Sequence, residues 1–93
     1  MPAVPEYLVE LYVSRDDAAA VRSGAKRARL AAEQLSNEGA RVHYLRSLFL
    51  PEEETCFYLY EAESAEHVRE AARRAALPVD NVVEAISEPK GAP

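Results

Sequence analysis

The residues best placed to do chemistry in this 93-residue chain are carboxylates and tyrosines that stand inside apolar stretches. Glu10 lies in LVELYV and Glu84 in NVVEAI, while Tyr58 and Tyr60 lie in TCFYLYEA. A carboxylate in apolar surroundings beside tyrosine hydroxyls can act as a general acid or base. Together with Arg46, the same carboxylates can instead form an ion-pair cluster that fixes strand register or a subunit contact. We favour the structural interpretation and keep Glu10 and Glu84 as catalytic candidates.

The histidines and the single cysteine give weaker signals. His43 and His67 lack an HxxxH spacing, so a metal site would need ligands from several strands or subunits. We therefore predict no metal or other cofactor, and His43 is the weak candidate ligand. Cys56 has no identifiable base, so we expect a small, half-buried residue rather than a nucleophile. A lone cysteine also excludes an internal disulfide and a CxxC motif.

Composition limits the class of protein. The formal net charge of −5 argues against nucleic acid as a partner. There is no basic-then-apolar N-terminal signal and no run of about 18 apolar residues, so we expect a cytoplasmic protein without a membrane span. Much of the 48% hydrophobic fraction is alanine, which buries little area per residue, so self-association should add burial. The length fits one domain, 1–93, with an ordered core over about 5–87 and a loose tail over 88–93.

Alternating residues predict the strands. Residues 7–13 should form the first strand, because one side of it is wholly apolar or aromatic and suits a core. That side comprises Tyr7, Val9, Leu11 and Val13. Three further strands are expected at residues 41–50, 55–61 and 81–86, and an acidic Pro-Glu-Glu-Glu turn joins the second strand to the third.

Between the first two strands, the sequence predicts a long amphipathic helix. It should start at Ser14 as N-cap and run to about Asn37. Gly24 inside it costs about 1 kcal/mol relative to alanine, and it marks either a close packing contact or a tolerated defect. Gly39 suits the left-handed residue that ends a helix. The apolar stripe of this helix comprises Val21, Ala25, Ala28, Ala32 and Leu35.

A second helix should follow the third strand, with Ser64 as its cap and Pro78 beyond its end. Its apolar stripe comprises Ala65, Val68, Ala72 and Ala75. The resulting order, β-α-β-β-α-β with short connections, is that of the ferredoxin-like sandwich. We therefore predict the α+β class, with two helices on one face of a four-stranded antiparallel sheet.

Two helices leave the other face of such a sheet uncovered. Alternation assigns to it Leu8, Glu10 and Tyr12, then Cys56, Tyr58 and Tyr60, then Val82, Glu84 and Ile86. Alternation leaves the face of the second strand open, and placing Arg46 away from the helices brings Tyr44 and Leu48 with it. A face this apolar should be an interface, a pocket wall or both. We predict a second copy of the chain as the partner and a small molecule as a further ligand. The predicted ligand-binding residues are Tyr12, Tyr44, Arg46, Tyr58 and Tyr60.

Several short motifs resemble a family of small bacterial proteins called nickel-binding-protein-like. They are PEYLVE at 5–10, YEAESAE at 60–66, VREAA at 68–72, LPVD at 77–80 and VE at 83–84. The resemblance implies a ferredoxin-like fold, usually a dimer, and a member that binds nickel through histidines. At three positions where the family often has histidine, cysteine and histidine, this chain has Arg46, Tyr58 and Ala71.

Three functions follow from these features, and the sequence leaves open whether the protein is an enzyme. The leading hypothesis is a small dimeric ligand-binding or accessory protein that uses the helix-free sheet face. The first alternative is a cofactor-independent isomerase, cyclase or monooxygenase with a carboxylate acid or base, by analogy of fold. The second alternative, which follows from the resemblance, is a nickel-binding protein.

Overall fold

The computed structural model describes residues 4–86, and the predicted tail over 88–93 lies outside the described residues. The order of helices and strands is the predicted one. The elements are β1 (Glu6–Tyr12), α1 (Ala18–Asn37), β2 (Val42–Leu50), the short 3₁₀ turn η1 (Pro51–Glu53), β3 (Thr55–Ala62), α2 (Ala65–Arg74) and β4 (Asn81–Ala85).

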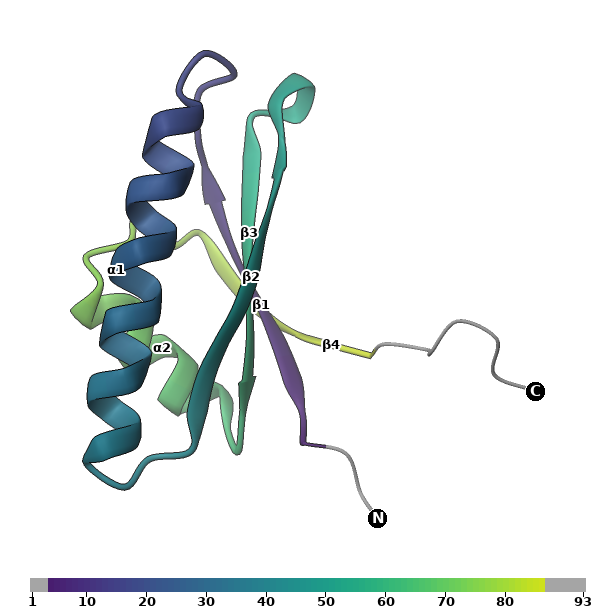
Figure 1. The fold of residues 1–93 in the computed structure, drawn as a ribbon. Helices are drawn as coiled ribbons and strands as arrows, with labels where there is room; N and C mark the ends of the chain where they lie inside the picture. Colours follow the sequence, from purple (N-terminus) through teal and green to yellow (C-terminus); the bar gives the residue numbers. More distant parts are fainter. Residues whose placement is uncertain (1–3, 87–93) are drawn as a thin grey trace, which may run out of the picture.

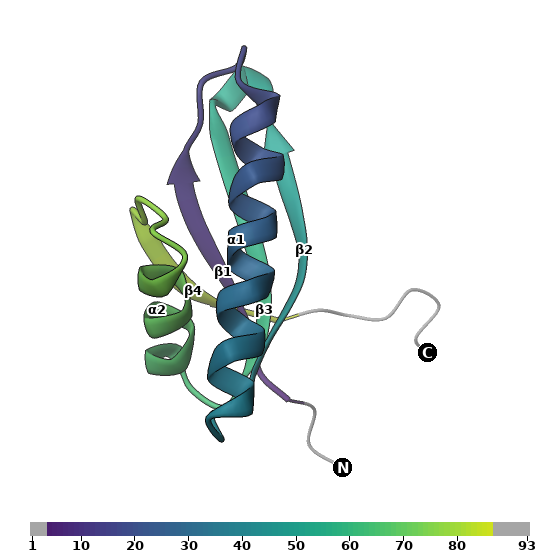
Figure 2. The same ribbon diagram turned by 60° about the vertical axis from the view of Figure 1, so that its left-hand side comes forward.

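The four strands form one antiparallel sheet in the order β2-β3-β1-β4. Each helix therefore connects two strands that have a third strand between them, which is the split β-α-β arrangement. Both helices lie on the same face of the sheet, α1 toward β2 and β3 and α2 beside α1 toward β4 (Figures 1 and 2). The prediction of a two-layer ferredoxin-like sandwich is confirmed.

The ends of the helices show how local hydrogen bonds set their boundaries. Asp17, and not Ser14, is the N-cap of α1, because the Asp17 amide donates to the Ser14 carbonyl in a turn and Asp17 Oδ1 accepts from the Ala20 amide at 3.1 Å. Gly39 follows α1 with φ of +102°, as predicted for the residue that ends the helix. Ser64 Oγ caps α2 by accepting from the His67 amide at 3.3 Å, which is also as predicted.

The core combines small residues on the helices with large residues on the sheet. Alanines dominate the buried stripes of both helices, and the largest fully buried side chains of the domain are the tyrosines of β3, Tyr58 and Tyr60. The Tyr58 hydroxyl donates to the Val21 carbonyl of α1 at 2.9 Å. A Cβ atom at Gly24 would overlap this hydroxyl. Gly24 is therefore a close packing contact, the first of its two predicted roles.

An ion-pair network joins the two helices at one end. Arg74 of α2 donates to both carboxylate oxygens of Glu38, the residue that follows α1, at 2.8 and 2.9 Å. Glu70 accepts from Arg74 and from Arg73, and these hydrogen bonds lower the pKa of Glu70 to about 2. The network involves several charges and two-pronged contacts, which makes it more stabilising than isolated surface pairs.

Candidate functional site

The helix-free face of the sheet is built from rows of side chains that run across all four strands, because directly paired residues point to the same side. The central row is Val83, Leu8, Leu59 and Arg46. On one side of it lies the row Asn81, Glu10, Phe57 and Leu48, and on the other side the row Ala85, Glu6, Glu61 and His43. We call these three rows the open face.

The predicted faces of β3 and β4 were wrong, while that of β1 was correct. Tyr58 pairs with Val9, whose side chain is in the core, so the β3 residues Cys56, Tyr58 and Tyr60 face the helices. The large rings of Tyr58 and Tyr60 fill the space that the alanine-rich helices leave above the sheet. In β4, Val82 pairs with Val9 and Glu84 with Tyr7, so both belong to the helix side, and Ile86 lies beyond the strand. Phe57, Leu59 and Val83 take their place on the open face.

A β-bulge explains why the predicted open-face residues of β2 were only partly correct. The pairing with β3 shifts between Tyr44 and Arg46, so Leu45 has no paired residue of its own. Tyr44 lies on the helix side, packed against the core, whereas Arg46 and Leu48 lie on the open face. Alternation across the bulge had placed Tyr44 with Arg46 and Leu48, and that placement was wrong.

The centre of the open face is apolar, and part of it is already shielded from water. Leu59 is 7% exposed although it does not belong to the core cluster under the helices. Around it, Leu8 and Phe57 are half-buried, while Leu48 and Val83 are 44% and 40% exposed. A contiguous apolar patch contributed by four strands is the usual mark of an interaction surface.

The predicted cluster of Glu10, Arg46 and Glu84 does not form. Glu84 is on the other side of the sheet, and β3 separates Glu10 on β1 from Arg46 on β2. Among residues 4–86, the ion pairs involve none of the three. Glu10 and Glu84 therefore do not share a site within one copy, and Glu10 and Arg46 flank the apolar centre with opposite charges.

Three of the four tyrosines that were predicted to bind a ligand form an aromatic cluster beneath the helices. The Tyr44 ring contacts the rings of Tyr58 and Tyr60 edge-on, with centroids 6.1 and 5.9 Å apart. Burial raises the pKa of both Tyr58 and Tyr60, so these hydroxyls stay protonated. Within the described chain the buried Tyr60 hydroxyl has no hydrogen-bond partner. Burial also raises the pKa of the Cys56 thiol, and the residue is fully buried where a half-buried one was predicted.

A cavity of about 320 Å³ lies between the sheet and the start of α1, and Tyr12 and Tyr58 both line it. Several polar groups around the cavity already form hydrogen bonds with other groups of the protein. Tyr58 donates to Val21, Asp17 caps α1, and Arg27 donates to Ser23 Oγ and to the Ala75 carbonyl, each at 2.8 Å. We interpret this cavity as a gap in packing and not as the predicted ligand site.

Metal-ligating residues are sparse on the open face. His43 of β2 pairs directly with Glu61 of β3, so a nitrogen and an oxygen donor lie side by side at one end of the face. Within residues 4–86, no group of three or more His, Cys, Asp or Glu side chains lies close enough to hold a metal ion. Arg46, Tyr58 and Ala71, at the positions where the resemblance implies nickel ligands, lie on the open face, in the core and in α2, respectively. Residues 4–86 of one copy therefore do not fit a complete nickel site.

Within the residues that the structure describes, neither helix combines the length and the apolar character that are required to cross a membrane.

The alternation of residue types did not reveal the site residues Phe57, Leu59, Val83 and Glu61. The signal that could have identified them is the alanine content of both helix stripes, which requires the larger alternating set of β3 to face the helices.

Fold and site thus define a small ferredoxin-like domain with one uncovered, partly apolar sheet face. The model of the nickel responsive protein SCO4226-like family matches residues 13–85, so the chain belongs to this family. Among solved structures, SCO4226 from Streptomyces coelicolor A3(2) is similar, with a TM-score of 0.70 and 22% sequence identity. That similarity covers 90% of this chain and 99% of the other, and it shows the shared fold. No curated protein sequence matches the chain. The predicted family resemblance is confirmed.

Proposed function

We propose that this protein is a homodimeric accessory protein of the nickel-responsive family, in which two copies meet through their open faces. The observation that carries the proposal is the apolar centre around Leu59, Phe57 and Leu8 on a face that no helix covers. Leaving such a patch in water is costly, at about 25 cal/mol for each Å² of apolar surface. A second copy offers a surface of the same composition.

The charges of the open face support a two-fold arrangement. Glu10 and Arg46 lie on the two strands that flank β3, on opposite sides of Phe57 and Leu59. In a two-fold dimer, a contact from residue i to residue j is repeated from j to i. An axis that runs in the interface above Phe57 and Leu59 places Glu10 of each copy opposite Arg46 of the other. One pair of residues thereby supplies two complementary contacts.

Charge reversal tests this arrangement. Glu10→Arg alone or Arg46→Glu alone creates two like-charge contacts per dimer, and we expect each change to raise the dimer Kd at least tenfold. The double variant restores opposite charges, so its Kd should lie within about threefold of the unmodified protein. Sedimentation equilibrium measures all four proteins. Equal losses in the single variants that simply add in the double variant would contradict the proposed pairing.

Transition-metal binding is a second candidate function, supported by the family description and by the adjacent side chains of His43 and Glu61. Two side-chain ligands are fewer than a tight site needs, so the remaining ligands would have to come from the second copy or from water.

Calorimetric titration with nickel checks this second candidate. We expect weak binding, with Kd of about 10 μM or above, that is lost in His43→Asn. His67→Asn is the matched control, because His67 lies in α2 and away from the open face. Nickel binding that is equal in both variants would rule out the His43 site.

A further inference from the structure

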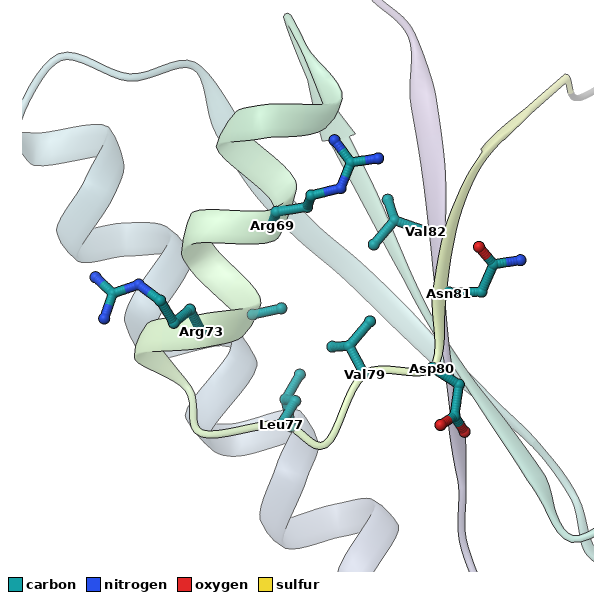
Figure 3. A pocket seen from close by; sticks show the side chains of 8 residues that line it. Arg69, Arg73, Leu77, Val79, Asp80, Asn81 and Val82 are labelled. Carbon is teal, nitrogen blue, oxygen red and sulfur yellow. The ribbon is translucent and has the colours of Figure 1, made fainter.

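A groove of about 430 Å³ runs between α2 and β4, and of its lining residues only Asn81 also belongs to the open face (Figure 3). Its floor is apolar, with Ala72 and Leu77 buried and Val79 and Val82 partly buried against the core. β4 is an edge strand, so the groove opens toward solvent at the border of the sheet. The volume is in the range that small organic ligands occupy.

The polar groups at this groove differ in how they are engaged. Asp80 Oδ2 accepts a hydrogen bond from the Tyr12 amide at 3.2 Å. Arg73 directs its guanidinium away from the groove and donates to Glu70 Oε1 at 2.9 Å. Arg69 instead extends from α2 toward β4, near Val82, and has no hydrogen bond or ion pair within residues 4–86. The groove therefore has one uncommitted cation beside an apolar floor.

We propose that this groove binds a small amphipathic carboxylate, with its apolar body on Leu77, Val79 and Val82 and its carboxylate on Arg69. A guanidinium pairs with a carboxylate through two parallel hydrogen bonds, which gives the head group a defined position. The apolar floor contributes affinity in proportion to the length of the ligand chain that it buries. The site is separate from the dimer contact, because Val82 faces the helix side of the sheet.

The test is an NMR titration of the full-length ¹⁵N-labelled protein with octanoate. We expect amide shifts that cluster at Arg69 and residues 77–82 and fit a Kd of about 1 mM or tighter. Arg69→Gln should weaken binding about tenfold, whereas the control Arg22→Gln, an exposed arginine of α1 outside the groove, should leave the Kd unchanged. Hexanoate should bind at least fivefold more weakly than octanoate, because it buries two fewer methylene groups.

Octanamide has the same chain without the charge, and it should bind about tenfold more weakly than octanoate. Equal affinity of octanamide and octanoate, shifts that cluster outside the groove, or no saturable shifts would each overturn the proposal. Sedimentation equilibrium of Arg69→Gln should match the unmodified protein, so failure of this site is distinguishable from failure of the dimer.

Discussion

Replacing Gly24 by alanine should destabilise the protein by about 2 kcal/mol, although the same change in the middle of a helix ordinarily stabilises it by about 1 kcal/mol. The reason is that a Cβ at this position overlaps the Tyr58 hydroxyl, which is buried and donates to the Val21 carbonyl. Tyr58 is fully buried between the sheet and α1, so its ring cannot move away without displacing the core.

A double-mutant cycle separates the overlap from other effects. Tyr58→Phe removes the hydroxyl and should cost about 1 kcal/mol, the value of one buried hydrogen bond. The overlap caused by Gly24→Ala requires the Tyr58 hydroxyl, which Tyr58→Phe removes. The double variant should therefore be about 1 kcal/mol more stable than the sum of the single changes implies. Urea unfolding followed by circular dichroism, at one fixed protein concentration, measures the four proteins.

Tyr60→Phe is the matched control for the tyrosine change. The Tyr60 hydroxyl is buried without a partner among the described residues, so its removal should alter the free energy of unfolding by no more than about 0.5 kcal/mol. A stabilising effect of Gly24→Ala, or strict additivity in the cycle, would contradict the packing described for α1 and β3.

Replacing Phe57 by aspartate should convert the proposed dimer to monomers, with a rise in the dimer Kd of about 1000-fold or more. Phe57 lies on the open face between Glu10 and Leu48, next to the apolar centre. A carboxylate there would be buried in the contact without a partner and would also repel Glu10. The fold should survive, because Phe57 is outside the core cluster under the helices.

Leu30→Asp provides the matched control. Leu30 is an exposed leucine on α1, 53% exposed, on the side of the molecule that carries the helices. The same change in charge should leave the dimer intact at that position. Sedimentation equilibrium supplies the masses, and circular dichroism confirms that both variants are folded. Dimers in both variants would show that the open face is not the contact.

Much of the architecture could be predicted because local signals agree with one another. The strand–helix order, the Ser64 cap, Gly39 and the core side of β1 follow from alternation, capping and turn chemistry. At the start of α1, two residue types suited to capping compete. Asp17 is the cap because Ser14 belongs to the preceding turn. The number of turn residues before a helix is not encoded in its apolar stripe.

The candidate site was harder to predict because both sides of β3 are apolar. Phe57 and Leu59 on one side and Tyr58 and Tyr60 on the other are equally suited to a strand, and a shift of one residue exchanges the two faces. The choice is made by the volume that the alanine-rich helices leave unfilled, which is a property of the packed structure. The bulge at Leu45 carries no glycine or proline that would mark it in the sequence.

The central claim is that two copies meet through their open faces, and cross-saturation NMR tests it most directly. The sample is an equimolar mixture of perdeuterated, ¹⁵N-labelled chain and unlabelled chain, in which saturation passes only from the unlabelled copy across the contact. We predict that the amide signals of Leu8, Phe57, Leu59 and their neighbours on β1 and β3 lose intensity. Loss confined to the helices α1 and α2, or no loss at protein concentrations far above the micromolar range, would contradict the claim.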